Sequence, residues 1–190
     1  EGRGAVTAIT TAGDGVVVEG HRSAIGGHFV QRLSGADGTT VWEDQTDDEV
    51  VYGYTVVDAR GDVFVARANF DGLVLRKLDG PSGRELWRYV RPQASSSVGV
   101  PSLAVDAAGD VLVGGHAFEK LDGASGDVLW RADVSGPLPY VFGIAIDPSG
   151  DVLAEVVAAG GDPRGFLADV IHVDGRSGSL IWRQSIGYPG

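Results

Sequence analysis

The chain contains no cysteine and no methionine among its 190 residues. Without cysteine it can form no disulfide bond and carry out no thiol chemistry, and a chain of this length can fold without such cross-links. Without methionine, Glu1 is not a translation start. We therefore expect a processed or excised piece of a longer protein, and a signal peptide, if the protein has one, lies outside this sequence.

Positive charge is also scarce, because 15 Lys and Arg residues face 26 Asp and Glu residues, which gives a net charge of -11. Proteins bind nucleic acids and anionic membrane surfaces mainly through Lys and Arg, so neither is expected as a partner. Apolar runs stay far below the roughly 20 residues of a membrane-spanning helix, so membrane insertion is not expected either.

Glycine is abundant, with 30 residues, and the apolar residues form short runs between turn signals. The helical pattern of apolar residues at i, i+3, i+4 and i+7 is broken throughout by Gly-Asp or Asp-Gly. Together these features predict an all-β chain of many strands joined by tight turns.

One motif occurs four times and contains every tryptophan of the chain. The copies are residues 32–43 (RLSGADGTTVWE), 77–88 (KLDGPSGRELWR), 120–131 (KLDGASGDVLWR) and 172–183 (HVDGRSGSLIWR). A Gly-Asp pair precedes each copy, at residues 13–14, 61–62, 109–110 and 150–151. Four strands and two turns therefore recur about every 45 residues, which is the size of one blade of a β-propeller.

We predict a β-propeller with four complete four-stranded antiparallel blades, standing alone or as half of an eight-bladed ring. The predicted blades are about residues 4–46, 50–90, 98–134 and 139–187. Apolar strand residues are often consecutive, as at residues 16–18 and 180–182, which is typical of sheets covered on both faces. A two-sheet sandwich is the alternative, but it does not explain the repeat.

The polar turns of the motif are expected to have a structural role. Their acidic residues can accept hydrogen bonds from amides two residues further on, and their last glycines can adopt positive φ. These turn residues are Asp79, Gly83, Asp122, Gly126, Asp174 and Gly178. The alternative is a Ca²⁺ site, although each turn offers one carboxylate where an EF-hand loop supplies at least three.

Three further aspartates, Asp58, Asp106 and Asp147, end the innermost strands and are expected to cap the turns that lead to the Gly-Asp pairs. The alternative is that they hold a cation. Lys77, Lys120 and His172 share one position in the repeat, which we expect to face solvent.

The D-x-x-G-D-V turn together with KLDGxSGxxLW resembles the bacterial quinoprotein-like (PQQ-type) β-propeller repeat and the related secreted SBBP-type repeats. The resemblance covers the whole chain and implies that the tryptophans dock one blade onto the next. These blade-docking residues are Trp42, Trp87, Trp130 and Trp182. The adjacent cysteine pair of the quinone-binding members has no match here, and the first repeat departs most, with Ser34 in place of the turn Asp.

Function is expected on the face that carries the variable connections, because loops on a rigid scaffold carry binding residues. Aromatic residues and one arginine near these connections form the predicted binding rim: Tyr52, Tyr54, Tyr89, Arg91, Tyr140 and Phe142. They could stack on a carbohydrate or a partner protein, or simply pack between blades. The sequence contains no catalytic constellation, zinc motif or phosphate loop, so no catalytic, cofactor-binding or metal residue is predicted.

These observations favour a non-catalytic binding or assembly module of a secreted or cell-surface bacterial protein, located in the extracellular space or the periplasm. The alternative is a fragment of a quinoprotein-type, PQQ-dependent dehydrogenase. Because an unclosed ring would expose an apolar face at each end, we also expect the chain to self-associate as a homodimer or to belong to a larger propeller.

Overall fold

The computed structural model describes residues 4–22, 27–46, 52–92, 102–134, 140–158 and 167–186. These ranges contain sixteen β-strands. Across the same ranges, no helix is long and apolar enough to cross a membrane. The predicted all-β class is confirmed, and it follows from the glycine-rich turns that interrupt every apolar run.

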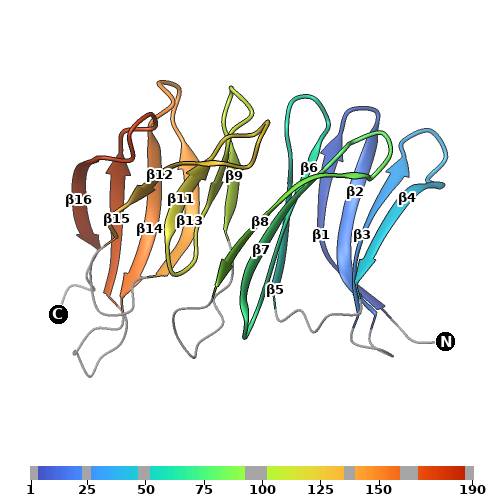
Figure 1. Ribbon diagram of the computed structural model, residues 1–190, viewed down its shortest axis with the longest axis horizontal. Helices are drawn as coiled ribbons and strands as arrows, with labels where there is room; N and C mark the ends of the chain where they lie inside the picture. Colours follow the sequence, from blue (N-terminus) through green and yellow to red (C-terminus); the bar gives the residue numbers. More distant parts are fainter. Residues whose placement is uncertain are drawn as a thin grey trace. The chain divides into compact units, whose positions relative to one another are not determined.

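The strands form four antiparallel sheets in which strand order follows sequence order (Figure 1). We call them blades 1 to 4. Blade 1 contains β1 (Gly4–Ala12), β2 (Gly15–Arg22), β3 (Gly27–Ser34) and β4 (Thr40–Thr46); blade 2 contains β5 (Tyr52–Val57), β6 (Val63–Asn69), β7 (Gly72–Leu78) and β8 (Glu85–Pro92). Blade 3 contains β9 (Leu103–Val105), β10 (Val111–Val113), β11 (Phe118–Leu121) and β12 (Val128–Ala132); blade 4 contains β13 (Tyr140–Ile146), β14 (Val152–Ala158), β15 (Leu167–Val173) and β16 (Leu180–Ile186).

The chain divides into two compact units, Glu1–Val98 with blades 1 and 2, and Gly99–Gly190 with blades 3 and 4. Each unit has its own apolar core between its two blades. In the first unit Val17, Val30 and Trp42 of blade 1 pack with Val63 and Leu78 of blade 2. The second core is formed in the same way by Leu112, Phe118, Trp130, Val152, Val156 and Ile171.

The second strands of blades 2 and 3 are covered on both faces, as the consecutive apolar runs predict. Residues 63–68 of β6 are buried throughout. The outermost strand of blade 4 differs, because every residue of β16 is exposed. The expectation of two covered faces is therefore wrong for residues 180–182, since their strand lies at the outer edge of the last blade.

Trp42 and Trp130 join the two blades of their units in the same way. The Trp42 indole N–H donates to the carbonyl of Gly80 at 2.7 Å, and the Trp130 indole N–H donates to that of Gly175 at 3.1 Å. Each ring also lies against the last glycine of the motif turn in the following blade, Gly83 or Gly178. The tryptophan of one blade therefore packs on the turn of the next blade, and the last position of that turn is glycine because a Cβ there would clash with the indole ring.

The other two tryptophans lie in different surroundings. Trp87 is partly buried and contacts Phe64 edge-on, with ring centroids 5.7 Å apart. Trp182 is 42% exposed, whereas Trp42 and Trp130 are 8% and 7% exposed. Trp182 contacts His172 of its own blade, with ring centroids 5.2 Å apart.

The turn glycines have positive φ, and the turn aspartates accept hydrogen bonds from the amides three residues further on. Gly83, Gly126 and Gly178 have φ values of 70°, 79° and 70°. The Asp79 carboxylate accepts a hydrogen bond from the Ser82 amide at 2.9 Å, and Asp122 and Asp174 accept equivalent bonds from Ser125 and Ser177, each at 2.7 Å. The side chains thus hold each turn closed through backbone amides.

The aspartates that end the inner strands have two roles at once. Asp58 Oδ1 accepts hydrogen bonds from the amides of Arg60 and Asp62, both at 2.9 Å, and its Oδ2 lies 3.1 Å from Lys77 Nζ. The expectation that Lys77 faces solvent is wrong, because its side chain is 3% exposed. The same holds for Lys120, which is buried between Asp106 and Asp110.

Replacing Gly83 by Ala should destabilise the first unit more than the equivalent Gly38→Ala change in blade 1. Both glycines have positive φ, 70° and 73°, so each alanine costs about 1–2 kcal/mol of backbone strain. A Cβ at Gly83 would also lie 2.7 Å from Trp42 Cδ2, whereas one at Gly38 meets nothing within 4 Å. Overpacking should add at least about 1 kcal/mol to the Gly83→Ala loss. Urea melts followed by circular dichroism measure both losses, and equal losses would contradict the docking of Trp42 on this turn.

Candidate functional site

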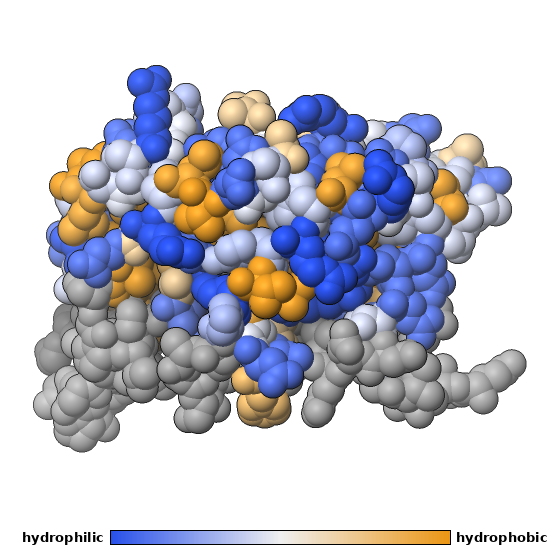
Figure 2. All heavy atoms as spheres, in the orientation of Figure 1, coloured by the Kyte–Doolittle hydropathy of each residue, from blue (hydrophilic) through white to orange (hydrophobic). Residues whose placement is uncertain are grey.

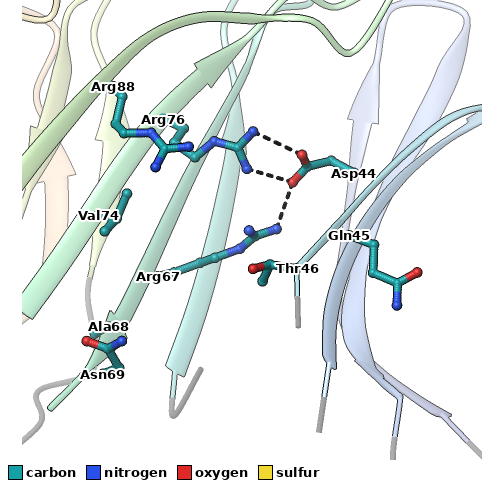
Figure 3. Close-up of a pocket in the computed structure, with 9 residues that line it drawn as sticks. All are labelled: Asp44, Gln45, Thr46, Arg67, Ala68, Asn69, Val74, Arg76 and Arg88. Carbon is teal, nitrogen blue, oxygen red and sulfur yellow. Dashed lines mark hydrogen bonds and ion pairs between the residues drawn. The ribbon is translucent and has the colours of Figure 1, made fainter. Parts of the chain in front are cut away.

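A cavity of about 230 Å³ lies between the two blades of the first unit (Figure 3). We call it the arginine cavity. Blade 1 contributes the end of β4, and blade 2 contributes β6, β7 and β8. Its lining residues are Asp44, Gln45, Thr46, Arg67, Ala68, Asn69, Val74, Arg76 and Arg88. Three of these nine side chains are arginines, so the cavity concentrates positive charge in an acidic protein.

Asp44 is the centre of an ion-pair network in this cavity. Its two oxygens accept hydrogen bonds from the Arg76 guanidinium at 2.8 and 3.0 Å, and one of them also accepts from Arg67 at 2.8 Å. Glu85 accepts from Arg76 at 2.5 Å and from Arg88 at 3.2 and 3.1 Å. Asp44 thus fixes the guanidinium groups of Arg67 and Arg76 (Figure 3), and Glu85 joins Arg76 to the more exposed Arg88.

Asp44 is ionised at neutral pH. Burial by itself raises the pKa of this carboxyl, but the hydrogen bonds and positive charge of Arg76, together with the charge of Arg67, outweigh burial, so its pKa lies below the ordinary value. A charged carboxylate between two buried guanidinium groups therefore holds blade 1 against blade 2.

Arg67 also joins a chain of hydrogen bonds outside the cavity, which runs through His28 to Glu19. Its Nε–H donates to His28 Nδ1 at 3.1 Å, so His28 carries its own proton on Nε2 and donates to Glu19 Oε1 at 2.7 Å. His28 and Glu19 are fully buried. Gly53 makes room for this pair, because a Cβ there would lie 2.1 Å from Glu19 Oε1. Arg67 is thus preorganised by contacts outside the cavity.

These residues depart from the repeat. The position of Arg67 is glycine or valine in the other repeats, at Gly20, Gly115 and Val156. Blade 2 also pairs Arg76 with Arg88 directly across two strands. The equivalent pairs in blades 1 and 3, Gln31 with Glu43 and Glu119 with Arg131, are joined by hydrogen bonds of 2.6 Å each. Blade 4 pairs Ile171 with Arg183 at this position.

Like charges directly opposite one another destabilise a sheet. In blade 2 the Glu85 carboxylate accepts hydrogen bonds from both arginines and offsets their repulsion. The other blades form without an arginine pair at this position, so the fold does not require it. Departures of this kind from a repeated pattern concentrate at functional sites. Comparing the repeats position by position is the sequence signal that finds this site.

Of the predicted rim residues whose side chains the structure describes, none lines the arginine cavity. In the first unit Tyr54 is exposed on β5, and Tyr89 and Arg91 are partly buried on β8. In the second unit Phe142 is exposed, whereas Tyr140 is buried, with its ring centroid 5.0 Å from that of His116 and 4.5 Å from that of Phe142.

Several predicted features lie outside the described residues. These are the side chain of Tyr52 and most of the variable connections, residues 47–51, 93–101, 135–139 and 159–166. Asp44, Arg67 and Arg76 lie within strands and not in the variable connections, so the prediction of a binding rim did not include them.

Comparisons with known proteins agree with this fold. No curated protein sequence matches the chain. Among solved structures, it is similar to the dihydro-heme d1 dehydrogenase NirN in complex with DHE, with 13% identity and a TM-score of 0.63, over 97% of this chain and 38% of that one. It is also similar to the Cps50 (Swd1) β-propeller domain of Myceliophteria thermophila, with 11% identity and a TM-score of 0.53, over 94% and 72% of the two chains.

At these identities the structural likenesses show the fold alone, and the chain spans well under half of the NirN chain. The sequence itself gives the family. Residues 3–184 match the PQQ-like repeat family that is described as outer membrane protein assembly factor BamB. Four repeated blades with their tryptophan and Gly-Asp positions carry this match over nearly the whole chain, and the protein therefore belongs to the PQQ-like β-propeller repeat family.

Proposed function

We propose that this chain is a non-catalytic binding or assembly module of a secreted or cell-surface bacterial protein, working in the periplasm or outside the cell. The description of its family as an outer membrane assembly factor supports this role and location. The single observation that carries the proposal is the preorganised arginine cavity.

The chemistry of the cavity selects an anionic ligand group. A guanidinium group is planar and presents several N–H donors in a fixed fork, which matches the two oxygens of a carboxylate. Asp44 and Glu85 hold Arg67 and Arg76, whereas the Arg88 side chain is 53% exposed and can turn toward a ligand. Gln45, Thr46 and Asn69 add neutral polar groups to the lining. We propose that an acidic segment of a partner protein places a carboxylate here.

The place of the cavity in the fold supports the same role. Thr46 is the last residue of β4 and Asn69 the last of β6, so the cavity opens where the strands lead into the variable connections. The constant turns at residues 35–39 and 79–83 lie at the opposite ends of the strands. A ligand in the cavity would therefore also lie near the segments that differ most between repeats.

Replacing Arg88 by Ala should weaken binding of a fluorescein-labelled hexapeptide of Asp and Glu at least about tenfold, because a hydrogen bond to a charged group contributes about 1.5–3 kcal/mol. Fluorescence anisotropy at low and high salt measures the affinity. Arg84→Ala is the matched control, since Arg84 is an exposed arginine in the turn at the other end of the strands, and it should leave binding unchanged.

Equal weakening by Arg84→Ala and Arg88→Ala, or no binding of the acidic peptide at millimolar concentration, would contradict the proposal. Tighter binding of an oligogalacturonate than of the peptide would assign the cavity to an acidic carbohydrate. Reduction of a dye above background with added quinone and Ca²⁺ would instead favour the dehydrogenase fragment.

We also propose that another blade covers the outer edge of blade 4. β16 exposes Leu180, Ile181 and Trp182, and Figure 2 shows apolar patches between polar regions on one face of the molecule. By analogy with Trp42 and Trp130, Trp182 should dock on the motif turn of a further blade, from a second copy of the chain or from a larger propeller. Light scattering should therefore give a mass of about two chains, and a strict monomer would argue against the dimer.

A further inference from the structure

Blades 2, 3 and 4 each contain a pair of aspartates that face one residue of the third strand. In blade 2, Lys77 Nζ lies 3.1 Å from Asp58 Oδ2 and 3.2 Å from Asp62 Oδ2. Blade 3 repeats this arrangement, with Lys120 Nζ at 2.7 and 3.4 Å from its two aspartates. An ammonium group therefore occupies the space between the two carboxylates in both blades. We call this space the cation slot.

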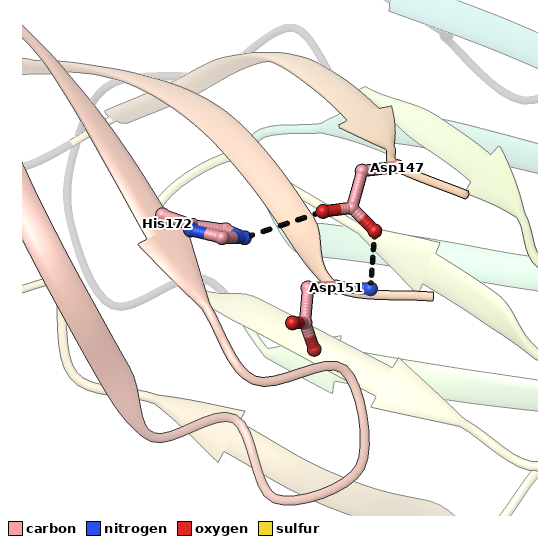
Figure 4. Close-up of side chains that lie close together, drawn as sticks. All are labelled: Asp147, Asp151 and His172. Carbon is pink, nitrogen blue, oxygen red and sulfur yellow. Dashed lines mark hydrogen bonds and ion pairs between the residues drawn. The ribbon is translucent and has the colours of Figure 1, made fainter. Parts of the chain in front are cut away.

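In blade 4 the residue at this position is His172, which faces Asp147 and Asp151 (Figure 4). Its Nε2 lies 3.6 Å from Asp147 Oδ2, which is too long for a good hydrogen bond. Both ring nitrogens are buried and neither has a hydrogen-bond partner. In blade 4 an imidazole, which can coordinate a metal ion through a ring nitrogen, therefore stands where blades 2 and 3 have an ammonium group, and both carboxylates are kept.

The two carboxylates of this slot are held in place by the backbone. Asp147 Oδ1 accepts hydrogen bonds from the amides of Ser149 at 2.8 Å and of Asp151 at 3.0 Å. Asp151 Oδ1 accepts from the Gly175 amide at 3.0 Å. One ligand atom from each aspartate and one from His172 lie within 4.8 Å of one another. The three groups therefore converge without any rearrangement of the backbone.

We infer that Asp147, Asp151 and His172 bind a divalent transition-metal cation such as Zn²⁺, which takes the place of the lysine ammonium. Zn²⁺ accepts both imidazole nitrogen and carboxylate oxygen, and three protein ligands leave a position for water. The His172 and Asp147 side chains are 18% and 26% exposed, so the ion can enter from solvent. Ca²⁺ fits less well, because it prefers oxygen ligands only. This site is separate from the arginine cavity and does not depend on the proposed function.

Titration of the metal-free chain with Co²⁺ and Zn²⁺ tests the inference. We expect one equivalent of Co²⁺ to bind with a visible absorption band, and Zn²⁺ to displace it. His172→Lys should weaken metal binding at least about tenfold, because it removes one metal ligand and places an ammonium group between the two carboxylates. Mutation of a residue that only orients a metal ligand already lowers metal affinity about 10–100-fold, so the loss of a ligand should cost at least as much. Lys120→His should create a second site with Asp106 and Asp110, and so raise the stoichiometry to two.

Thermal unfolding gives a second readout. Zn²⁺ should raise the Tm of the natural chain but not that of His172→Lys, because a ligand that binds only the folded state stabilises it. In metal-free buffer His172→Lys should unfold at the same temperature as the natural chain or higher. Asp151→Asn, which keeps the size and the acceptor oxygen, should also abolish the Zn²⁺ effect. Equal Zn²⁺ responses of these variants and the natural chain, or no bound metal in the natural chain, would overturn the inference.

Discussion

Replacing Asp44 by Ala should lower the free energy of unfolding of the first unit by about 3–5 kcal/mol, the range for removing one partner of a buried ion pair. The change leaves Arg67 and Arg76 without the carboxylate that they share, and both side chains are at least 87% buried. The positive charges would then lie close together with no anion between them. Urea unfolding followed by circular dichroism measures the loss.

Glu43→Ala is the control for this change. Glu43 is the neighbouring residue on β4, and its side chain is exposed and hydrogen-bonded to Gln31. Its removal should cost less than about 1 kcal/mol, since exposed pairs contribute little. Losses of the same size for Asp44→Ala and Glu43→Ala would show that the ion-pair network does not join the blades.

The same network predicts a pH dependence. The pKa of Asp44 is lowered in the folded protein, so the folded state favours the ionised carboxylate. Its stabilising effect is therefore complete above the unfolded pKa of about 3.9 and is lost as pH falls through the lower folded pKa. Asp44→Asn should remove this part of the acid destabilisation, which urea melts between neutral and acidic pH would measure.

Replacing Trp130 by Ala should destabilise the second unit by about 3–5 kcal/mol, as expected for a large aromatic side chain removed from a core. Trp130 is 7% exposed, packs in the core of its unit and donates a hydrogen bond to Gly175 of blade 4. Unfolding followed by far-ultraviolet circular dichroism measures the loss without relying on tryptophan fluorescence.

Trp182→Ala provides the matched control, because Trp182 has the same position in the repeat but is 42% exposed. At a protein concentration low enough to separate associated copies, Trp182→Ala should cost less than about 1.5 kcal/mol, since little packing is then lost. A loss as large as that of Trp130→Ala would mean that another surface already covers Trp182, as self-association requires. A small loss for both variants would contradict the docking role of the repeated tryptophan.

The fold was predictable because the repeat encodes local structure redundantly. The Gly-Asp pairs, the Asp-Gly turns and the tryptophans each mark the same strand boundaries in several copies, so one irregular copy does not obscure the pattern. Burial was less predictable. Lys77 looks like a surface residue, but it is buried because Asp58 and Asp62, far from it in sequence, neutralise its charge.

The arginine cavity was not predicted, for a related reason. Its residues come from two blades and meet only through packing, so spacing along the chain does not show that Asp44 lies between Arg67 and Arg76. Of the aromatic residues predicted for the rim, only Tyr54 and Phe142 are exposed among the described side chains, because the sequence does not show which aromatics pack between blades. A residue-by-residue alignment of the repeats would have identified Arg67 as a departure, although not its contact with His28.

Nuclear magnetic resonance mapping tests the binding role of the arginine cavity most directly. The ¹⁵N-labelled chain would be titrated with the Asp/Glu hexapeptide while backbone amide and arginine Nε signals are followed. We predict saturable shifts for Asp44, Arg67, Arg76 and Arg88, with little change at the turn from Asp79 to Gly83. Shifts confined to that turn, or shifts that never saturate, would contradict the account.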